Sequence, residues 1–565
     1  MIWRCTMYSA DMRDAQLILG YSDVFSGEKP NLIDRIKKLN MHKAISIISE
    51  LIQIRDAQCD PINIANRIEF RFPLETILKR DFCNMNPKSP EDLIKNKKMA
   101  KSQHIISLQM LLILLKKVII YGDYDSLKIK DYKIQNQDYQ EIIILQLLIA
   151  DEISEKHKRD IDTDHFLYAT YHLNYRRNVA NEVQRMYYMM ERLSRNSEIF
   201  DDDVRTEYRD YYQDFTLKYG ITPTEYIVFL FWELHYYNSS KNALSKAKCW
   251  RNIDIIYRDI KEKEKMSKVI DILKTEPFKL KEWAKQTEME EWDFTSFFAF
   301  PFLSDGGNEY ISISDISLIN AFFEKIFWLI RDCYPEDDSR AMAFFGRLFE
   351  HYIQDATEDA CKNDYIYIDE FEFKVKRDTR KSSDAYIRKG KDLLVVEAKG
   401  FSVLVDCMAK NEKIENNNKK LFVKPVLQAD ACLNEIIDKK EEFDGIEEAF
   451  IISVTLDNIN AVPNYYNAIH KEISKNKKCK VIHYYYNFSI EEYEMLLYLI
   501  EKEIDIFSIL REYFNGRVLA PFSNYIREKE STIDMTEFMN KNYKKVADKM
   551  KSTLWSEEEN CRNSD

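Results

Sequence analysis

Residues 384–399 contain the pattern that most restricts what this chain can fold into. Two segments with strand-like composition, Asp384–Arg388 and Asp392–Lys399, are separated by Lys389-Gly390-Lys391. A glycine at the first central position of a two-residue loop favours a type II′ turn, so Gly390-Lys391 is the expected tip of a β-hairpin. In that register Asp384 lies directly opposite Glu397, with their Cβ atoms about 5 Å apart.

Two carboxylates in this position repel each other, and a hairpin with a purely structural role would tend to avoid them. A bound divalent cation removes the repulsion. Mg²⁺ prefers oxygen ligands and commonly takes one or two carboxylates from a protein. Lys399 follows Glu397 by two residues, so both side chains are expected on one face of the strand. There the lysine could orient an attacking water or offset negative charge at phosphorus. The alternative is a solvated cross-strand cluster of salt bridges.

The motif Ser383-Asp384…Glu397-Ala398-Lys399 resembles that of the PD-(D/E)XK nuclease superfamily. The resemblance covers about residues 340–460 and implies a restriction-endonuclease-like α/β (α+β) core, in which helices flank a mixed four-stranded sheet. It implies Asp384 and Glu397 as ligands of Mg²⁺, or of Mn²⁺ in its place, and Lys399 as the catalytic lysine. Ser383 stands where the superfamily is named for a proline, at a position that varies.

Two further residues match the superfamily pattern. Glu350 corresponds to an acidic residue on the preceding helix, which implies a catalytic and metal-binding role. Gln428 corresponds to a glutamine on the helix after the motif, which implies a catalytic role. Each has a structural alternative: Glu350 can be solvated or paired with Arg347 one turn earlier, and Gln428 can be an ordinary amide in the first turns of a helix.

The charge around the motif favours a nucleic-acid substrate. Between Lys374 and Lys424 there are 14 Lys or Arg and 7 Asp or Glu, a net charge of +7, whereas the whole chain carries −12. Such a patch attracts phosphates regardless of sequence. The alternative is a set of basic loops on a solvated edge. The expected nucleic-acid-binding residues are Lys374, Lys376, Arg377, Arg380, Lys381, Arg388 and Lys389.

Before residue 290 the apolar residues follow a helical period, with helices expected near 103–120, 139–155, 163–196 and 205–218. Thr222-Pro223-Thr224-Glu225 predicts a capping box and a helix to about Tyr237. This helix could belong to a helix-turn-helix, but its residues 227–232 are apolar on every side, which favours a buried helical hairpin. A run of tyrosines and arginines between 168 and 192 could stack bases, although packing explains it better.

The pattern changes near residue 295, where two short strands around Ser304–Asn308 predict a hairpin. The expected layout is a largely helical part of unknown role (1–290), a hairpin and helix (291–340), the nuclease domain (341–505) and a helical extension with a disordered tail from about Ser556 (506–565). Within the nuclease domain Ser489 and Glu492 predict a second capping box.

The cysteines set the expected compartment. The ten cysteines are scattered, with no zinc or disulfide spacing, which indicates a reduced, cytoplasmic protein. There is no signal-peptide pattern and no apolar run long enough for a membrane span, so no membrane partner is expected.

The sequence therefore predicts a Mg²⁺-dependent nuclease that hydrolyses phosphodiester bonds, with DNA the favoured substrate and restriction, repair or anti-phage defence as fitting roles. The helical half could bind a protein partner. Cutting both strands with one site per chain often requires two copies, which would make the protein a homodimer. The alternative is a non-catalytic nucleic-acid-binding or assembly protein with a nuclease-like fold.

Overall fold

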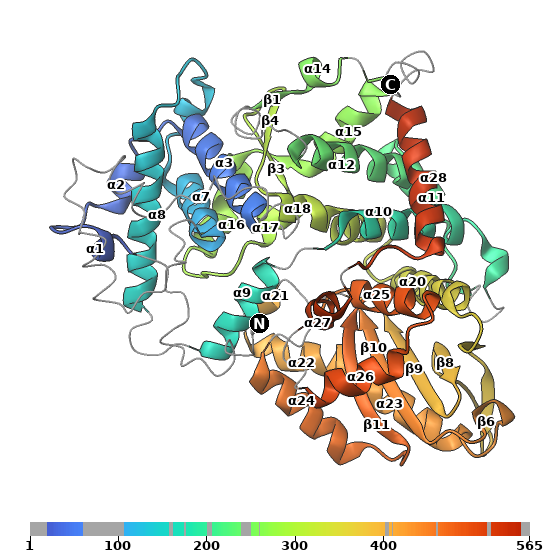
Figure 1. The fold of residues 1–565 in the computed structure, drawn as a ribbon. Helices are drawn as coiled ribbons and strands as arrows, with labels where there is room; N and C mark the ends of the chain where they lie inside the picture. The colour runs from blue at the N-terminus through green and yellow to red at the C-terminus, as the bar shows by residue number, and fades with distance from the viewer. Residues whose placement is uncertain are drawn as a thin grey trace. The chain divides into compact units, whose positions relative to one another are not determined.

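The computed structural model of the protein has a mixed α/β fold in which helices predominate (Figure 1). None of the helices that it describes is both long and apolar enough to cross a membrane. The predicted tail from Ser556 lies outside the described residues. These are 20–59, 107–156, 162–174, 177–200, 206–238, 250–258, 260–401, 406–409, 411–458, 462–516, 521–530 and 532–554.

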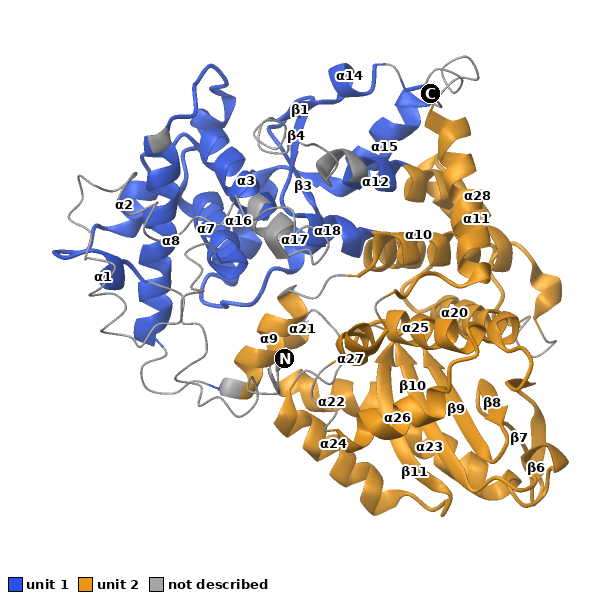
Figure 2. Ribbon diagram, viewed as in Figure 1, with its two compact units in different colours: residues 1–162, 229–321 blue, residues 163–228, 322–565 orange. Residues whose placement is uncertain are grey.

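The chain forms two compact units, each made of two separate stretches of sequence (Figure 2). Unit 1 contains residues 1–162 and 229–321, and unit 2 contains residues 163–228 and 322–565. This division differs from the predicted boundaries at 290, 340 and 505. Residues 163–228, expected in the helical half, belong to the same unit as the β8–β9 region at residues 385–399, whereas the hairpin after residue 300 belongs to unit 1.

Unit 1 combines helices with a small four-stranded sheet in the order β1-β4-β3-β2. Strands β3 and β4 form the predicted antiparallel hairpin, and residues 295–299 just before it are helical. The elements are α1 (Tyr21–Val24), α2 (Leu32–Ile36), α3 (Met41–Cys59), α7 (Leu108–Tyr121), η4 (Tyr124–Lys128), α8 (Asn136–Lys156), β1 (Arg251–Asn252), α14 (Ile253–Ile256), α15 (Lys263–Leu273), β2 (Lys274–Thr275), α16 (Pro277–Gln286), α17 (Thr295–Ala299), β3 (Phe302–Ser304), β4 (Glu309–Ser312) and α18 (Asp315–Asn320).

The first part of unit 2 is helical, and helix α12 crosses the division between the units. The predicted helix over 163–196 is interrupted after Asn174, because Asn178 caps a new helix through its side chain. The elements are α9 (Thr163–Asn174), α10 (Val179–Tyr187), the π-helix η5 (Tyr188–Leu193), η6 (Ser197–Ile199), α11 (Tyr211–Tyr219), α12 (Pro223–Asn238), the π-helix η8 (Ala321–Lys325), α19 (Ile326–Arg331) and α20 (Ser339–Ala360).

The predicted cap of α12 is confirmed. The Glu225 N–H donates to Thr222 Oγ1 at 3.1 Å, and the Thr222 N–H donates to Glu225 Oε2 at 2.8 Å. Residues 226–230 are buried, as expected for a packed helical hairpin. Tyr168 and Arg185 are fully buried, which agrees with packing and leaves neither free to stack bases. Tyr175 and Arg176 of the same run lie outside the described residues.

The second part of unit 2 holds a five-stranded mixed sheet in the order β11-β10-β9-β8-β5. Strands β5, β8 and β9 pair antiparallel, and β9, β10 and β11 pair parallel. The elements are β5 (Ile366–Asp369), β6 (Glu372–Val375), β7 (Asp378–Lys381), β8 (Ala385–Lys389), β9 (Asp392–Lys399), α21 (Asp406–Ala409), η9 (Asn411–Lys413), α22 (Ile414–Asn418), η10 (Lys419–Val423), α23 (Lys424–Ile436), η11 (Glu441–Phe443), β10 (Glu448–Thr455), α24 (Pro463–Asn476), β11 (Ile482–Ser489), α25 (Ile490–Glu501), α26 (Ile506–Asn515), α27 (Phe522–Lys529) and α28 (Glu537–Leu554).

Helices cover both faces of this sheet. Alternate residues of β9, Leu393 and Val395, pack with α23 and α24 in one apolar core. The intervening residues face the other way, and on that side Phe450 of β10 packs against Phe507 of α26. Figure 1 shows α26 in front of the strands and α23 behind them. Because β9 is covered on both faces, its central residues are all apolar.

Residues 366–375 contain two strands that have different partners. Only β5 joins the sheet, while β6 leaves it and pairs with β7 in a separate two-stranded ribbon. The second predicted capping box is confirmed at the start of α25, where Ser489 and Glu492 exchange hydrogen bonds.

A buried polar network explains why residues 179–187 belong to unit 2. The Arg185 guanidinium on α10 donates to both oxygens of Glu494 on α25, at 3.0 and 3.1 Å, and to Glu182 at 2.8 Å. The Tyr352 hydroxyl on α20 donates to the same Glu494 at 2.6 Å. The side chains of the Arg and both Glu are at most 1% exposed, so each charge depends on its partner.

Candidate functional site

The predicted hairpin forms with the predicted register. Lys389 pairs with Asp392, and the pairing continues without a shift to Ala385 and Val396. Gly390 has φ +60°, which suits the first central position of the turn. Asp384 is the next residue beyond Ala385, so the register brings it opposite Glu397, on the face of the sheet that α23 covers.

Asp384 is held at the end of the hairpin by two hydrogen bonds. Its Oδ2 accepts the backbone N–H of Ala398 at 2.6 Å, and its backbone carbonyl accepts the Gln354 amide of α20 at 3.0 Å. The side chain is 8% exposed. Burial and the nearby Glu397 carboxylate raise the pKa of Asp384 to about 7, against the lowering effect of Lys399.

Glu397 is almost completely buried, and one of its oxygens has no hydrogen bond. Oε2 lies 3.4 Å from Lys399 Nζ, whereas Oε1 is buried without a partner. The Ser383 hydroxyl lies near enough to lower the pKa of Glu397, but its geometry is not that of a hydrogen bond. Burial outweighs Lys399 and Ser383 and raises the pKa of Glu397.

Lys399 supplies the positive charge of this cluster. Its side chain is 25% exposed, so the ammonium group can be reached from solvent. Burial lowers its pKa, but Asp384, Glu397 and Glu350 together outweigh burial and raise it. The lysine is therefore charged at neutral pH, beside carboxylates that burial and mutual repulsion make harder to ionise.

Glu350 on α20 lies within electrostatic reach of the hairpin cluster. Burial and Asp384 raise its pKa to about 7, while Arg347 and Lys399 lower it. Its Oε2 also accepts a hydrogen bond from Arg347 at 2.8 Å, which is the pairing that the structural alternative predicts. The structure thus brings Glu350 to the site and also gives it a local partner.

Gln428 lies in the second turn of α23, on the helix that packs against the face of β9 where Glu397 projects. It is exposed. No hydrogen bond joins its side chain to Asp384, Glu397 or Lys399, all of which the structure describes. The structure therefore places Gln428 on the helix that covers this face, but its side chain is exposed and lies outside the cluster.

The basic residues divide into two groups. Lys374, Lys376, Arg377 and Arg380 are exposed on the β6–β7 ribbon, and Lys381 of the same ribbon pairs with Glu370 at 3.5 Å. Arg388 and Lys389 lie at the turn end of the hairpin, away from Asp384.

Both residues at the turn end have local contacts. The Arg388 guanidinium donates to the backbone carbonyls of Glu442 and Asp444. Lys389 Nζ lies over the Tyr365 ring, 4.5 Å from its centroid. These contacts hold the end of the sheet together. They occupy the charged groups of Arg388 and Lys389, whereas Lys374, Lys376, Arg377 and Arg380 of the ribbon are exposed.

Two residues of the site were missed by sequence reasoning. Gln354 positions Asp384 through its backbone carbonyl, and it lies one turn after Glu350 on α20, a spacing that could have been noticed. Glu370, just after β5, raises the pKa of Asp384 through its charge, and burial together with the charge of Glu350 raises the pKa of Glu370 itself. Nothing in its local sequence distinguishes it from other surface acids.

Comparisons of the chain with protein-family models, with curated proteins and with solved structures returned no match.

Proposed function

We propose that unit 2 is a divalent-metal-dependent nuclease that hydrolyses the phosphodiester bonds of DNA, with its centre at Asp384, Glu397 and Lys399. The observation that carries the proposal is the pair of buried carboxylates across the end of the β8–β9 hairpin, with Lys399 3.4 Å from Glu397. A structural hairpin has no use for two buried acids that raise each other's cost of ionisation.

The residues present fit a metal ion. Buried polar atoms are nearly always paired, yet Glu397 Oε1 has no partner. A hard dication bound between Asp384 and Glu397 would satisfy this oxygen and offset the repulsion. Glu350 is a third carboxylate for the same ion, and the all-oxygen set suits Mg²⁺ or Mn²⁺.

A bound Mg²⁺ supplies a Lewis acid that polarises the phosphate and lowers the pKa of water. The Lys399 ammonium, charged and accessible, binds a phosphate oxygen or orients the attacking water, and it offsets the negative charge that develops at phosphorus. The hydrogen bond from Ala398 N–H keeps the Asp384 carboxylate oriented toward the centre.

DNA is proposed as the substrate because the exposed cations lie on a strand ribbon close in sequence to the site. Lys374, Lys376, Arg377 and Arg380 present four positive charges along β6, β7 and the turn between them. Contacts of this kind bind phosphates without reading bases, so they position a duplex rather than select a sequence. The choice of DNA over RNA, and a role in restriction, repair or defence, come from the resemblance of the motif.

The test is cleavage of supercoiled plasmid DNA by the full-length protein with Mg²⁺ or Mn²⁺. Asp384→Asn and Lys399→Met should each lower the rate by at least about 100-fold. EDTA should abolish cleavage. The matched control is Lys439→Met, which removes an equally long lysine, 62% exposed, from the same unit.

Two outcomes would overturn the proposal: equal cleavage by wild type and both variants, or no cleavage by the wild type with either metal. In the second case, unchanged DNA binding would favour the alternative, a nucleic-acid-binding protein that does not cut. Circular dichroism of each variant separates loss of chemistry from loss of folding.

A further inference from the structure

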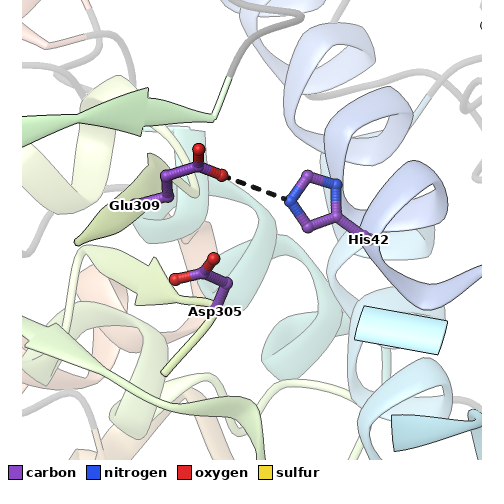
Figure 3. Close-up of side chains that lie close together, drawn as sticks. All are labelled: His42, Asp305 and Glu309. Atoms are coloured by element: carbon purple, nitrogen blue, oxygen red, sulfur yellow. Dashed lines mark ion pairs between the residues drawn. The ribbon is translucent and has the colours of Figure 1, made fainter. Parts of the chain in front are cut away.

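Unit 1 contains a second group of side chains with the chemistry of metal ligands (Figure 3). His42 comes from the first turn of α3, Asp305 directly follows β3, and Glu309 is the first residue of β4. One ligand atom from each of the three lies within 4.8 Å of the other two. The group joins parts of the chain that are more than 260 residues apart in sequence.

His42 is held so that one ring nitrogen points at the carboxylates. The side chain is 4% exposed, its ring stacks on Trp250 with centroids 4.3 Å apart, and Nδ1 lies 2.6 Å from the Tyr132 hydroxyl. Nε2 is buried without a hydrogen bond, and Glu309 Oε2 is 3.8 Å from it. A histidine that binds a metal is typically fixed in this way, through a hydrogen bond at its other nitrogen.

The two carboxylates are partly satisfied by protein groups. Asp305 Oδ1 accepts the Gly307 N–H at 2.8 Å. Lys130 Nζ contacts Asp305 Oδ2 and lies 3.0 Å from Glu309 Oε2. The Lys130 side chain is 46% exposed, so its ammonium group can move into solvent at low cost. The two carboxylates therefore already have a cation between them, the Lys130 ammonium. This ammonium leaves His42 Nε2 without a partner.

We propose that His42, Asp305 and Glu309 bind a transition-metal dication of the Zn²⁺ type. A site of one imidazole and two carboxylates suits Zn²⁺ better than Mg²⁺, which prefers oxygen ligands alone. With three protein ligands, water or another group completes a four-coordinate shell. The ion displaces Lys130, satisfies His42 Nε2 and fastens the β3–β4 hairpin to the start of α3. This site lies in the other unit and does not rest on the proposed nuclease.

The test is a Zn²⁺ titration of the untagged full-length protein against a chromogenic chelator. All proteins carry Asp384→Ala, so that the proposed nuclease centre contributes little to binding. We expect one Zn²⁺ per chain. His42→Gln and Glu309→Gln should each weaken binding by at least about 100-fold, because even loss of an outer partner of a ligand costs about 10–100-fold. The control is His470→Phe, since the Nε2 atom of His470 is also buried without a partner but no nearby carboxylate shifts the pKa of this histidine.

Lys130→Gln separates a metal site from a simple salt bridge. Removing the competing ammonium should tighten Zn²⁺ binding, whereas a group that exists only to pair with Lys130 would lose stability and still bind no Zn²⁺. If His42→Gln does not fold, Glu309→Gln and Lys130→Gln carry the test. The proposal is wrong if the wild-type site binds no Zn²⁺, or if binding is equal with and without Glu309. Plasmid cleavage by Asp384-containing protein is measured separately, so failure of either proposal is distinguishable from failure of the other.

Discussion

The carboxylate of Asp384 accepts a hydrogen bond from the backbone N–H of Ala398 at 2.6 Å. The bond links the residue before β8 to strand β9. In β9, Ala398 lies between Glu397 and Lys399. An oxygen acceptor is enough to keep it, and an asparagine side chain has one. Position 384 can therefore lose its charge and keep its place in the hairpin.

The first prediction concerns stability without metal. In EDTA at pH 8, Asp384→Asn should raise the midpoint of thermal unfolding, because burial and Glu397 raise the pKa of Asp384 to about 7 and make its ionised form costly. The variant keeps the ion pair between Glu397 and Lys399, in which one negative charge faces one positive charge. Adding Mg²⁺ should raise the midpoint of the wild type more than that of the variant. A variant that unfolds below the wild type in EDTA would contradict the repulsion described here.

The second prediction concerns the basic ribbon. Replacing Lys374, Lys376, Arg377 and Arg380 together by Gln should weaken binding to duplex DNA. It should also reduce the dependence of log K on log salt by up to about 4, since each phosphate contact contributes about 0.9. Fluorescence anisotropy of the Asp384→Ala protein at several salt concentrations measures both quantities.

Arg388→Gln is the control for the ribbon, because Arg388 donates to backbone carbonyls at the hairpin turn and should affect stability more than DNA binding. An unchanged salt dependence in the fourfold variant would exclude the ribbon as the DNA contact.

The third prediction concerns the buried network. Arg185→Met leaves Glu182 and Glu494 buried without their cation and should lower the free energy of unfolding by about 3–5 kcal/mol. Lys439→Met, which breaks an exposed pair with Glu435, should cost less than about 1 kcal/mol. Urea unfolding of both variants gives the comparison, and similar values for the two would show that the network contributes little.

The fourth prediction concerns acid. Burial lowers the pKa of His470 to about 3, below its ordinary value of 6.5. Between these two pH values the histidine is protonated in the unfolded chain and neutral in the folded chain. The stability from this group is complete above pH 6.5 and is lost as the pH falls toward 3. His470→Phe keeps the aromatic packing on Tyr466. Between pH 6.5 and pH 5 the free energy of unfolding should fall by about 2 kcal/mol less in this variant than in the wild type.

Tyr466→Phe is the control for this experiment, because it changes the same aromatic contact but keeps the histidine. Its stability should fall with pH in parallel with that of the wild type. A parallel curve for His470→Phe as well would mean that other groups determine the acid sensitivity.

The fifth prediction compares two glycines with open space around the site of an added Cβ. Gly390 has φ +60° at the hairpin turn, so Gly390→Ala should cost about 1 kcal/mol through backbone strain alone. Gly346 lies inside α20, where alanine should stabilise the helix by about 0.5–1 kcal/mol. Urea unfolding should therefore move in opposite directions, and equal shifts would contradict the turn geometry.

The hairpin could be predicted from sequence because all its determinants are local. The turn glycine at 390, the apolar run before Glu397 and the alternation of side chains fix the register within sixteen residues. The ribbon could not be predicted, because Lys376 takes φ +58° in the β6–β7 turn, where a glycine or asparagine would have marked it.

The contribution of residues from other elements was equally hidden. Gln354 reaches Asp384 from α20, and Arg185 reaches Glu494 across 309 positions of sequence. Such contacts depend on tertiary packing, and apart from the one-turn spacing of Gln354 from Glu350 the local pattern carries no signal for them. For the same reason the sequence carries no local sign that residues 163–228 pack in unit 2.

The interleaving of the two units has a consequence for how this protein can be dissected or recombined. The chain passes from one unit to the other after residues 162, 228 and 321. A fragment that starts near residue 340 would lack α10 and leave Glu494 without its arginine. Neither half can be exchanged for a foreign module by a single crossover, so we expect the two units to be inherited, expressed and lost together.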